Sequence, residues 1–254
     1  MIGRTLNDFE VNLPGTWDRM EKMEAERDSM YSDMMLMYEI WCGVKGSQPD
    51  NVYHKIQTVY KRDPETKFKT LLCGDYSLPE FEFLKDNKWV FTEKVDGTNI
   101  RVIFDKGECF YRGKTDNAQL HLQLVERLHD LFDVGKMADM FDSQVCLYGE
   151  GYGPKIQSGG KYKSSQDFVL FDVKVGDWWL RRKDVEDIAE TLGLDIVPII
   201  GEGTLNDMVD MTRKGFYSLW GNFIAEGIVA RPETELMTRS GNRIITKIKH
   251  RDFK

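Results

Sequence analysis

The sequence predicts an α+β fold in which antiparallel sheets are flanked by helices, with a helical extension at the N-terminus. From Tyr53 onward the chain consists mainly of short apolar or alternating segments, which are typical of strands. The few helical stretches between them do not alternate regularly with the strands, as they would in a doubly wound parallel sheet. Residues 16–43 instead carry apolar side chains at the spacing of one long helix.

The predicted N-terminal helix has a methionine-rich face. Its apolar positions are Met20, Met23, Met30, Met34, Met37 and Trp41, which recur three or four residues apart with one interruption. Such a face either packs on the main domain or binds a protein partner, because methionine surfaces adapt to varied partners. Residues 43–51 resemble a linker, so we divide the chain into an extension, 1–50, and a main domain, 51–254.

The main domain is expected to contain eight strands and three helices. Gly176 and Asp177 form a hairpin turn, Thr204 is the N-cap of one helix, and Gly193 and Gly215 end two helices. The helices are expected at 117–132, 183–192 and 205–214, and the strands at 89–93, 100–104, 108–112, 145–148, 168–175, 178–180, 224–230 and 243–249.

Composition narrows the class of protein. The chain has 254 residues with 35 Lys+Arg and 42 Asp+Glu, a net charge of −7 that disfavours binding nucleic acid through overall charge. No apolar run approaches the ~20 residues of a bilayer span, and the N-terminus lacks a secretory signal, so no membrane partner and a cytoplasmic location are expected. The four single cysteines (Cys42, Cys73, Cys109 and Cys146) are predicted to be reduced core residues without zinc.

Chemistry is suggested first by the segment from Lys94 to Asn99, which reads Lys-Val-Asp-Gly-Thr-Asn between two predicted strands. A turn at a strand end can present an amine to a buried pocket, where it acts as a nucleophile. Taken alone, the segment is more typical of a lysine–aspartate pair at a β-turn.

Further segments follow in a fixed order. They are Arg112, Leu147-Tyr148-Gly149-Glu150, Val169-Leu170-Phe171-Asp172-Val173, Glu226-Gly227-Ile228-Val229 and Lys247-Ile248-Lys249. With Lys94, this series resembles the motifs of the covalent nucleotidyltransferase superfamily, which includes polynucleotide ligases and mRNA capping enzymes. Their order and spacing are most similar to the RNA ligase 2 branch, and the resemblance spans residues 55–253. The lead-in 55–58 and the stretch 150–153 resemble phage-type members.

The resemblance implies an adenylation domain and an ATP-dependent RNA ligase that joins a 3′-hydroxyl to a 5′-phosphate. Lys94 would attack the α-phosphorus of ATP and hold AMP, with Lys247 and Lys249 on the phosphates. Glu226 would bind Mg²⁺ or Mn²⁺. The remaining nucleotide contacts implied are Phe171 on the purine face, Glu93 near the adenine edge, Glu150 on the ribose hydroxyls, and Asn99 and Arg112 on the ribose-phosphate.

Charge balance independently favours a metal. A lysine with its ordinary pKa of about 10.4 is almost entirely protonated at pH 7 and does not attack phosphorus. Lys247 and Lys249 share one face of a strand and would lower the pKa of Lys94. The carboxylates of Glu93, Asp96 and Glu226 would raise it. A divalent cation on Glu226 would neutralise the acids, so metal dependence is expected.

The loop at 154–165 is rich in glycine, serine and lysine. Lys155, Lys161 and Lys163 either follow a phosphate backbone or belong to a solvated loop, and Tyr162 is a candidate for stacking on a base.

Other activities stay open at this stage. Only five residues follow Lys249, so no C-terminal OB domain is expected, which disfavours a DNA ligase or capping enzyme. The substrate is expected to be RNA ends, in a nicked or broken duplex, with a DNA or DNA/RNA-hybrid nick ligase as the alternative. An alternative of another class is a non-catalytic nucleotide-binding module that docks a partner through residues 16–43.

Overall fold

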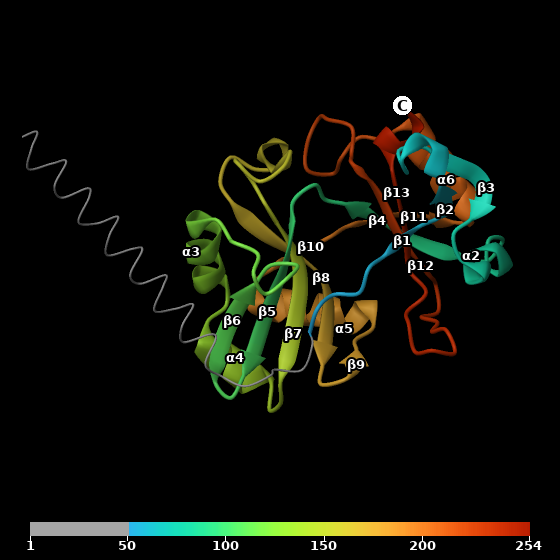
Figure 1. Cartoon of the computed structure of the whole chain (residues 1–254). Helices are drawn as coiled ribbons and strands as arrows, with labels where there is room; N and C mark the ends of the chain where they lie inside the picture. The colour runs from blue at the N-terminus through green and yellow to red at the C-terminus, as the bar shows by residue number, and fades with distance from the viewer. Residues whose placement is uncertain (1–50) are drawn as a thin grey trace, which may run out of the picture. The chain divides into compact units, whose positions relative to one another are not determined.

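The computed structural model describes residues 51–254, which form two β-sheets, a small hairpin and the helices that cover them (Figure 1). The predicted helix at 16–43 and the partner surface assigned to it lie outside the described residues. The division of the chain after residue 50 therefore stays a prediction.

The first sheet has five strands, and its three central strands are antiparallel. Trp89 and Phe91 alternate with more exposed residues along β4, so one face of the sheet is apolar. That face packs against Leu205 and Met208 of α6 and against Phe81 of α2 in one core cluster. The strand order is β1 (Gln57–Thr58), β13 (Thr246–Lys249), β12 (Gly227–Pro232), β4 (Trp89–Lys94) and β11 (Ile199–Gly203), and the helices are α2 (Pro79–Phe83) and α6 (Leu205–Lys214).

The second sheet has six strands, and three helices pack against it. Its core includes Ile100, Leu124, Met137 and Val185, which come from the sheet and from each helix in turn. The strand order is β10 (Asp195–Ile196), β8 (Asp167–Val175), β7 (Val145–Tyr152), β5 (Thr98–Asp105) and β6 (Glu108–Arg112), with β9 (Trp178–Trp179) beside β8; the helices are α3 (Leu122–Leu131), α4 (Val134–Met140) and α5 (Arg182–Leu192).

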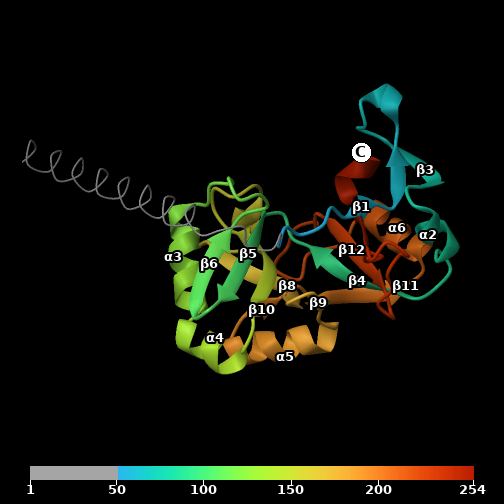
Figure 2. The same ribbon diagram turned by 60° about the horizontal axis from the view of Figure 1, so that its bottom comes forward.

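A two-stranded hairpin projects beside the C-terminal end of the five-stranded sheet (Figure 2). It consists of β2 (Tyr60–Arg62) and β3 (Leu71–Tyr76), and the short helix η1 (Pro64–Thr66) lies in its loop. The other short helices are η2 (Gly159–Lys161) and η3 (His250–Phe253).

The strands and helices predicted within residues 51–254 are all found, with shifted ends. The strand expected from 224 begins at Gly227, because Ile224 forms only an isolated bridge with Tyr217. The helix expected from 117 begins at Leu122, after the extended N-cap His121. Thr204 forms a complete capping box with Asp207, and Gly193 ends α5 in the left-handed conformation, as expected. No pattern predicted the short elements β1, β2, β3, β10, β11, α2 and α4.

The prediction for the cysteines is wrong at Cys73, which is exposed on β3, a hairpin strand with four consecutive exposed residues. Cys146 is buried as expected, and Cys109 is half-buried. Among residues 51–254, no helix is long and apolar enough to cross a bilayer.

The two sheets are joined at the segment that carries Lys94. Strand β4 of the five-stranded sheet ends at Lys94, and β5 of the six-stranded sheet begins at Thr98. The three residues between them therefore pass directly from one sheet to the other, and side chains at this crossing face both.

Candidate active site

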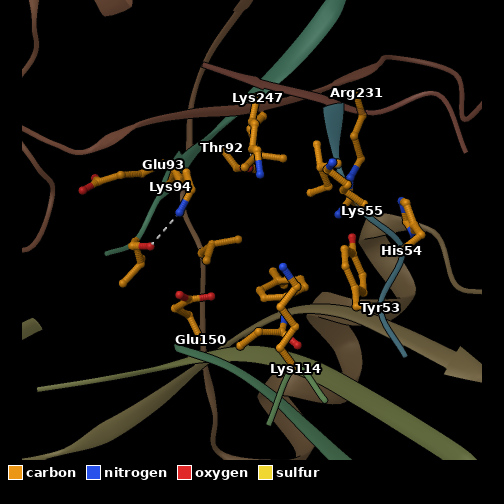
Figure 3. Close-up of a pocket in the computed structure, with 16 residues that line it drawn as sticks. Tyr53, His54, Lys55, Thr92, Glu93, Lys94, Lys114, Glu150, Arg231 and Lys247 are labelled. Atoms are coloured by element: carbon orange, nitrogen blue, oxygen red, sulfur yellow. Dashed lines mark hydrogen bonds between the residues drawn. The ribbon is translucent and has the colours of Figure 1, made fainter. Parts of the chain in front are cut away.

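Side chains from both sheets line a pocket at the crossing (Figure 3). Lys94 and Glu150 lie on one side of the space, and Lys55, Lys114 and Lys247 point into it from around its rim. The full lining comprises Tyr53, His54, Lys55, Ile56, Thr92, Glu93, Lys94, Val95, Asn99, Lys114, Glu150, Phe171, Val197, Val229, Arg231 and Lys247.

Glu226 holds two lysines together. The Lys94 Nζ donates to Glu226 Oε2 at 2.6 Å, and Lys249 Nζ lies 2.6 Å from Oε1 of the same carboxylate. The pairing follows from sheet register, because Gly227 lies opposite Lys94 on β4 and opposite Lys249 on β13. A Cβ at Gly227 would lie 2.1 Å from the Ile248 carbonyl oxygen, so only glycine allows the strands to approach this closely.

The turn after Lys94 is fixed by two further groups. The Asp96 amide donates to the hydroxyl of Tyr162 at 3.1 Å, and the Gly97 amide donates to Glu150 Oε1 at 3.2 Å. A Cβ at Gly97 would meet the Gly151 carbonyl oxygen at 2.2 Å, so β7 leaves room only for glycine. The backbone of the turn is thereby held against the six-stranded sheet.

Lys247 belongs to a row of side chains across the five-stranded sheet. Thr92, Val229 and Lys247 are register partners on β4, β12 and β13, and all three line the pocket. Burial, followed by the positive charges of Lys94 and Lys249, lowers the pKa of Lys247 to about 8. Lys247 and Lys249 alternate with the buried Thr246 and Ile248, which confirms that the two lysines share a face.

The carboxylates determine the charge of Lys94. Burial alone would lower its pKa, but the nearby carboxylates of Glu150 and Glu226 outweigh burial and hold the pKa of Lys94 above its usual value. The effect expected of Lys247 and Lys249 is therefore not the dominant one. Burial also raises the pKa of Glu150 to about 7, although Lys94 opposes this rise.

Three of the predicted nucleotide contacts meet in the pocket. Asn99 and Glu150 are register partners on β5 and β7, and Phe171 reaches the pocket from β8. The Asn99 Oδ1 is buried without a hydrogen-bond partner. Because buried polar atoms normally have partners, this oxygen fits a site that receives a polar ligand group.

The structure does not bring the other two predicted contacts into the pocket in the same way. Along β4, Glu93 alternates with Lys94, and its carboxylate points away from the central space, where it accepts from the Leu219 amide at 3.0 Å (Figure 3). Burial raises the pKa of Glu93. Arg112 on β6 donates to the Tyr111 carbonyl at 3.2 Å and is absent from the pocket lining.

Several pocket residues were not predicted. Tyr53 and His54 stack with ring centroids 4.6 Å apart, in the segment before β1, and Lys114 lies in the loop after β6. No periodicity marks these segments. Arg231 is different, because Gly227, Val229 and Arg231 alternate along one strand and could have been placed on the same face.

Asp172, next to Phe171, is the centre of a buried cluster of charges. Its carboxylate is fully buried and accepts from Arg231 at 2.6 and 3.0 Å and from Arg243 at 3.0 and 3.2 Å. Tyr53 donates its hydroxyl to the same carboxylate. The cluster ties β8 of the six-stranded sheet to β12 and to the segment before β13.

In the loop at 154–165, Lys155, Lys161 and Lys163 are all exposed, and Lys163 also pairs with Asp167. Both interpretations of these lysines therefore stay open. Tyr162 is buried against Tyr152 and Phe223, so its ring supports the turn after Lys94 and is not available to stack on a base.

The donor set of the pocket fits a divalent cation such as Mg²⁺ or Mn²⁺. Both cations favour carboxylate oxygens and bind proteins through one or two carboxylates while keeping several waters. Glu226 and Glu150 supply such oxygens next to Lys94. No group of three or more His, Cys, Asp or Glu ligands occurs among residues 51–254, so the protein would supply only part of the coordination.

Comparison with solved structures shows a similar fold. In fold, the chain is similar to an unliganded mutant of Naegleria gruberi RNA ligase, with a TM-score of 0.57 and 18% identity over 82% of this chain and 62% of that one. It is likewise similar to a mutant of the same ligase with ATP and Mn, with a TM-score of 0.56, 17% identity and coverage of 82% and 64%. The chain thus spans less than two thirds of these relatives.

A family model described as RNA ligase matches residues 87–249, which is more than half of the chain. The match runs from the strand before Lys94 to Lys249 and so covers every residue that the sequence assigned to the site. The chain belongs to the RNA ligase family.

Proposed function

We propose that this chain is an ATP-dependent RNA ligase that joins a 3′-hydroxyl to a 5′-phosphate through AMP carried on Lys94. The observation that supports it most is the position of Lys94. Its amine enters a pocket between two sheets, hydrogen-bonded to Glu226 at 2.6 Å, with further lysines around the rim of the space.

In the first step the Lys94 nitrogen forms a bond to the α-phosphorus of ATP, and the bond from that phosphorus to the bridging oxygen breaks, releasing pyrophosphate. The amine, which Glu226 Oε2 holds by a hydrogen bond, must lose its proton before it attacks. Lys247 would hold the phosphates through its ammonium group. Phe171 would stack on the base, and Asn99 and Glu150 would bind the polar groups of the sugar.

Glu226, assisted by Glu150, would hold the divalent cation. When bound, that cation supplies positive charge that offsets the triphosphate and the two carboxylates. The later transfers of AMP to the 5′-phosphate and its displacement by the 3′-hydroxyl then depend on positioning and electrostatics.

Two further parts of the proposal extend beyond this pocket. Residues 1–50 are proposed to form an extension that recruits substrate or a partner, separate from the adenylation domain at 51–254. Membership of the RNA ligase 2 branch and a phage-type origin rest on the motifs alone.

The test of the proposal is intact-protein mass spectrometry after incubation with ATP and Mg²⁺. Wild type is expected to gain one AMP, and Lys94→Ala none. Lys174→Ala is the matched control and should adenylate normally, because Lys174 pairs with the exposed Asp177 and does not line the pocket. GTP and NAD⁺ are run beside ATP, with Mn²⁺ as a second metal.

Absence of an adduct in protein that is free of AMP at the start, with every nucleotide and metal, would contradict the proposal. An adduct that persists in Lys94→Ala would assign the nucleophile to another residue. Nicked RNA, DNA and hybrid duplexes then test the substrate, and sealing of DNA alone would make the chain a DNA nick ligase.

A further inference from the structure

The loop of the β2–β3 hairpin presents an aromatic ring to solvent between two lysines. Phe68 is 61% exposed, and Lys67 and Lys69 on either side of it are also exposed. A phenylalanine this exposed contributes little to folding, because its ring stays in water. The exposed position of Phe68 therefore indicates a role in binding.

The loop holds this ring in a defined conformation. Lys67 and Phe68 have φ of 54° and 60°, in the left-handed region that residues other than glycine rarely adopt. Hydrogen bonds maintain it: the Phe68 amide donates to the Asp63 carbonyl at 2.9 Å, and the Lys67 amide donates to the Pro64 carbonyl at 3.0 Å. The exposed ring is thus held by a turn that backbone hydrogen bonds fix.

Arg62 connects this loop to the helix that follows β13. Its guanidinium donates to the carbonyls of Phe68 at 3.4 Å and Lys69 at 3.3 Å, and on its other side to Asp252 of η3 at 2.8 Å. Arg251, directly before Asp252, and Lys254, two residues after it, are exposed. We call Lys67, Phe68, Lys69, Arg251 and Lys254 together the hairpin-tip surface.

The charge of this surface contrasts with that of the chain, whose net charge is −7. Four of its five members are cationic, and the neighbouring Asp252 is already paired with Arg62. The acids of the loop are Asp63, which caps the Glu65 amide at 2.9 Å, and Glu65 itself. Cations around an accessible aromatic ring complement a polynucleotide, whose phosphates bind lysine and whose bases stack on rings.

The hairpin leads directly from the pocket wall. Lys55 lines the pocket, and the chain continues through β1, where Thr58 pairs with Lys247, into β2 and the loop. Phe68 lies thirteen residues after Lys55, so the two are separated by at most about 45 Å. A polynucleotide whose reacting end lies at Lys94 could therefore reach the loop of the hairpin with its flanking nucleotides.

We propose that the hairpin-tip surface binds the RNA substrate at a distance from the reacting ends, with Phe68 stacked on a base and the lysines on phosphates. This inference rests on the proposed function for its choice of RNA. It adds a contact surface outside the nucleotide pocket, provided by the hairpin and η3.

The experiment measures binding of the full chain to a fluorescent nicked RNA duplex by anisotropy at several salt concentrations. Phe68→Ala is expected to raise Kd by about 5- to 100-fold, as loss of one stacked base does, and Phe68→Tyr should restore binding. Lys67→Gln with Lys69→Gln should reduce the slope of log Kd against log salt by about 1 to 2.

Matched controls come from the other sheet. Trp178→Ala removes an aromatic side chain that is 79% exposed, and Lys136→Gln with Lys183→Gln removes two exposed lysines on α4 and α5. Both controls should bind RNA as wild type does. All variants should accept AMP from ATP to the wild-type extent, since none lies in the pocket.

The outcomes separate this inference from the proposed function. The inference is overturned, even if AMP is transferred, if Phe68→Ala and the Lys67→Gln, Lys69→Gln variant both bind RNA with wild-type affinity. It is also overturned if the controls lose as much affinity for RNA as these variants do. Loss of binding to nicked DNA but not to RNA, or wild type that binds no RNA, also overturns it. A missing AMP adduct with hairpin-dependent RNA binding would contradict the ligase and leave the RNA surface standing.

Discussion

Lys247 is flanked by two other ammonium groups and partly removed from water, and both effects lower its pKa, to about 8. Its charge is therefore complete only below that pH. Phosphate bound to Lys247 needs this charge and, once bound, raises the pKa of the lysine.

We predict that affinity for AMP, measured by calorimetry without metal, falls about tenfold between pH 7 and pH 9.5, the size of one charge-assisted hydrogen bond. Lys247→Arg keeps its charge throughout and should show a nearly flat profile. Identical profiles for wild type and Lys247→Arg would assign the phosphate contact to another residue.

Residues in contiguous segments were the ones that the sequence could identify. Lys94, Asn99, Glu150, Phe171 and Lys247 all line the pocket, and each stands in or beside a strand with a clear apolar pattern. The orientation of side chains was harder to predict from the sequence. Alternation along β4 turns the Glu93 carboxylate away from Lys94, which a motif written as adjacent letters does not reveal.

At the scale of elements, Asp172 connects the two sheets. Two arginines and a tyrosine converge on this one carboxylate, and despite its burial they hold its pKa below the usual value. The stabilisation is therefore present above the unfolded pKa of about 3.9 and is lost as the pH falls through the lower folded value.

We predict that Asp172→Asn lowers the free energy of unfolding at pH 7 by about 3–5 kcal/mol, because Arg231 and Arg243 lose their buried counter-charge and keep only the less buried Glu235. Asp177→Asn is the control: its side chain is fully exposed, and its loss should change stability by less than about 0.5 kcal/mol. Urea denaturation measures both. Equal stability of the two variants would mean that the cluster does not hold the sheets together.

Element length explains which parts of the fold were predictable. Strands such as β5 and β8, with eight and nine residues, show their period clearly and were identified. β1 and β10 have two residues each, which is too short for any period, and they depend on partners far along the chain. The same holds for Tyr53 and Lys114, which tertiary contacts alone bring to the pocket.

At the scale of the whole molecule, residues of the described part of the chain, 51–254, already form a complete wall around Lys94 from both sheets. We predict that a variant lacking residues 1–50 still accepts AMP from ATP at a rate close to that of the full chain, measured by mass spectrometry. If the extension recruits substrate, the same variant should bind nicked RNA more weakly. Insoluble protein or loss of AMP transfer would make residues 1–50 part of the fold.

The passage of the chain from one sheet to the other at Lys94 also sets a time at which the protein becomes reactive. Lys55 and Lys247 both line the pocket, but Lys55 is synthesised early. Lys247 lies in β13 and follows nearly two hundred residues later. Contacts this far apart in sequence form slowly, because the intervening chain must first be ordered. On the ribosome, a nascent chain that ends before Lys247 would thus carry Lys94 without the complete pocket that it needs to react. Uptake of AMP would therefore report that folding is complete.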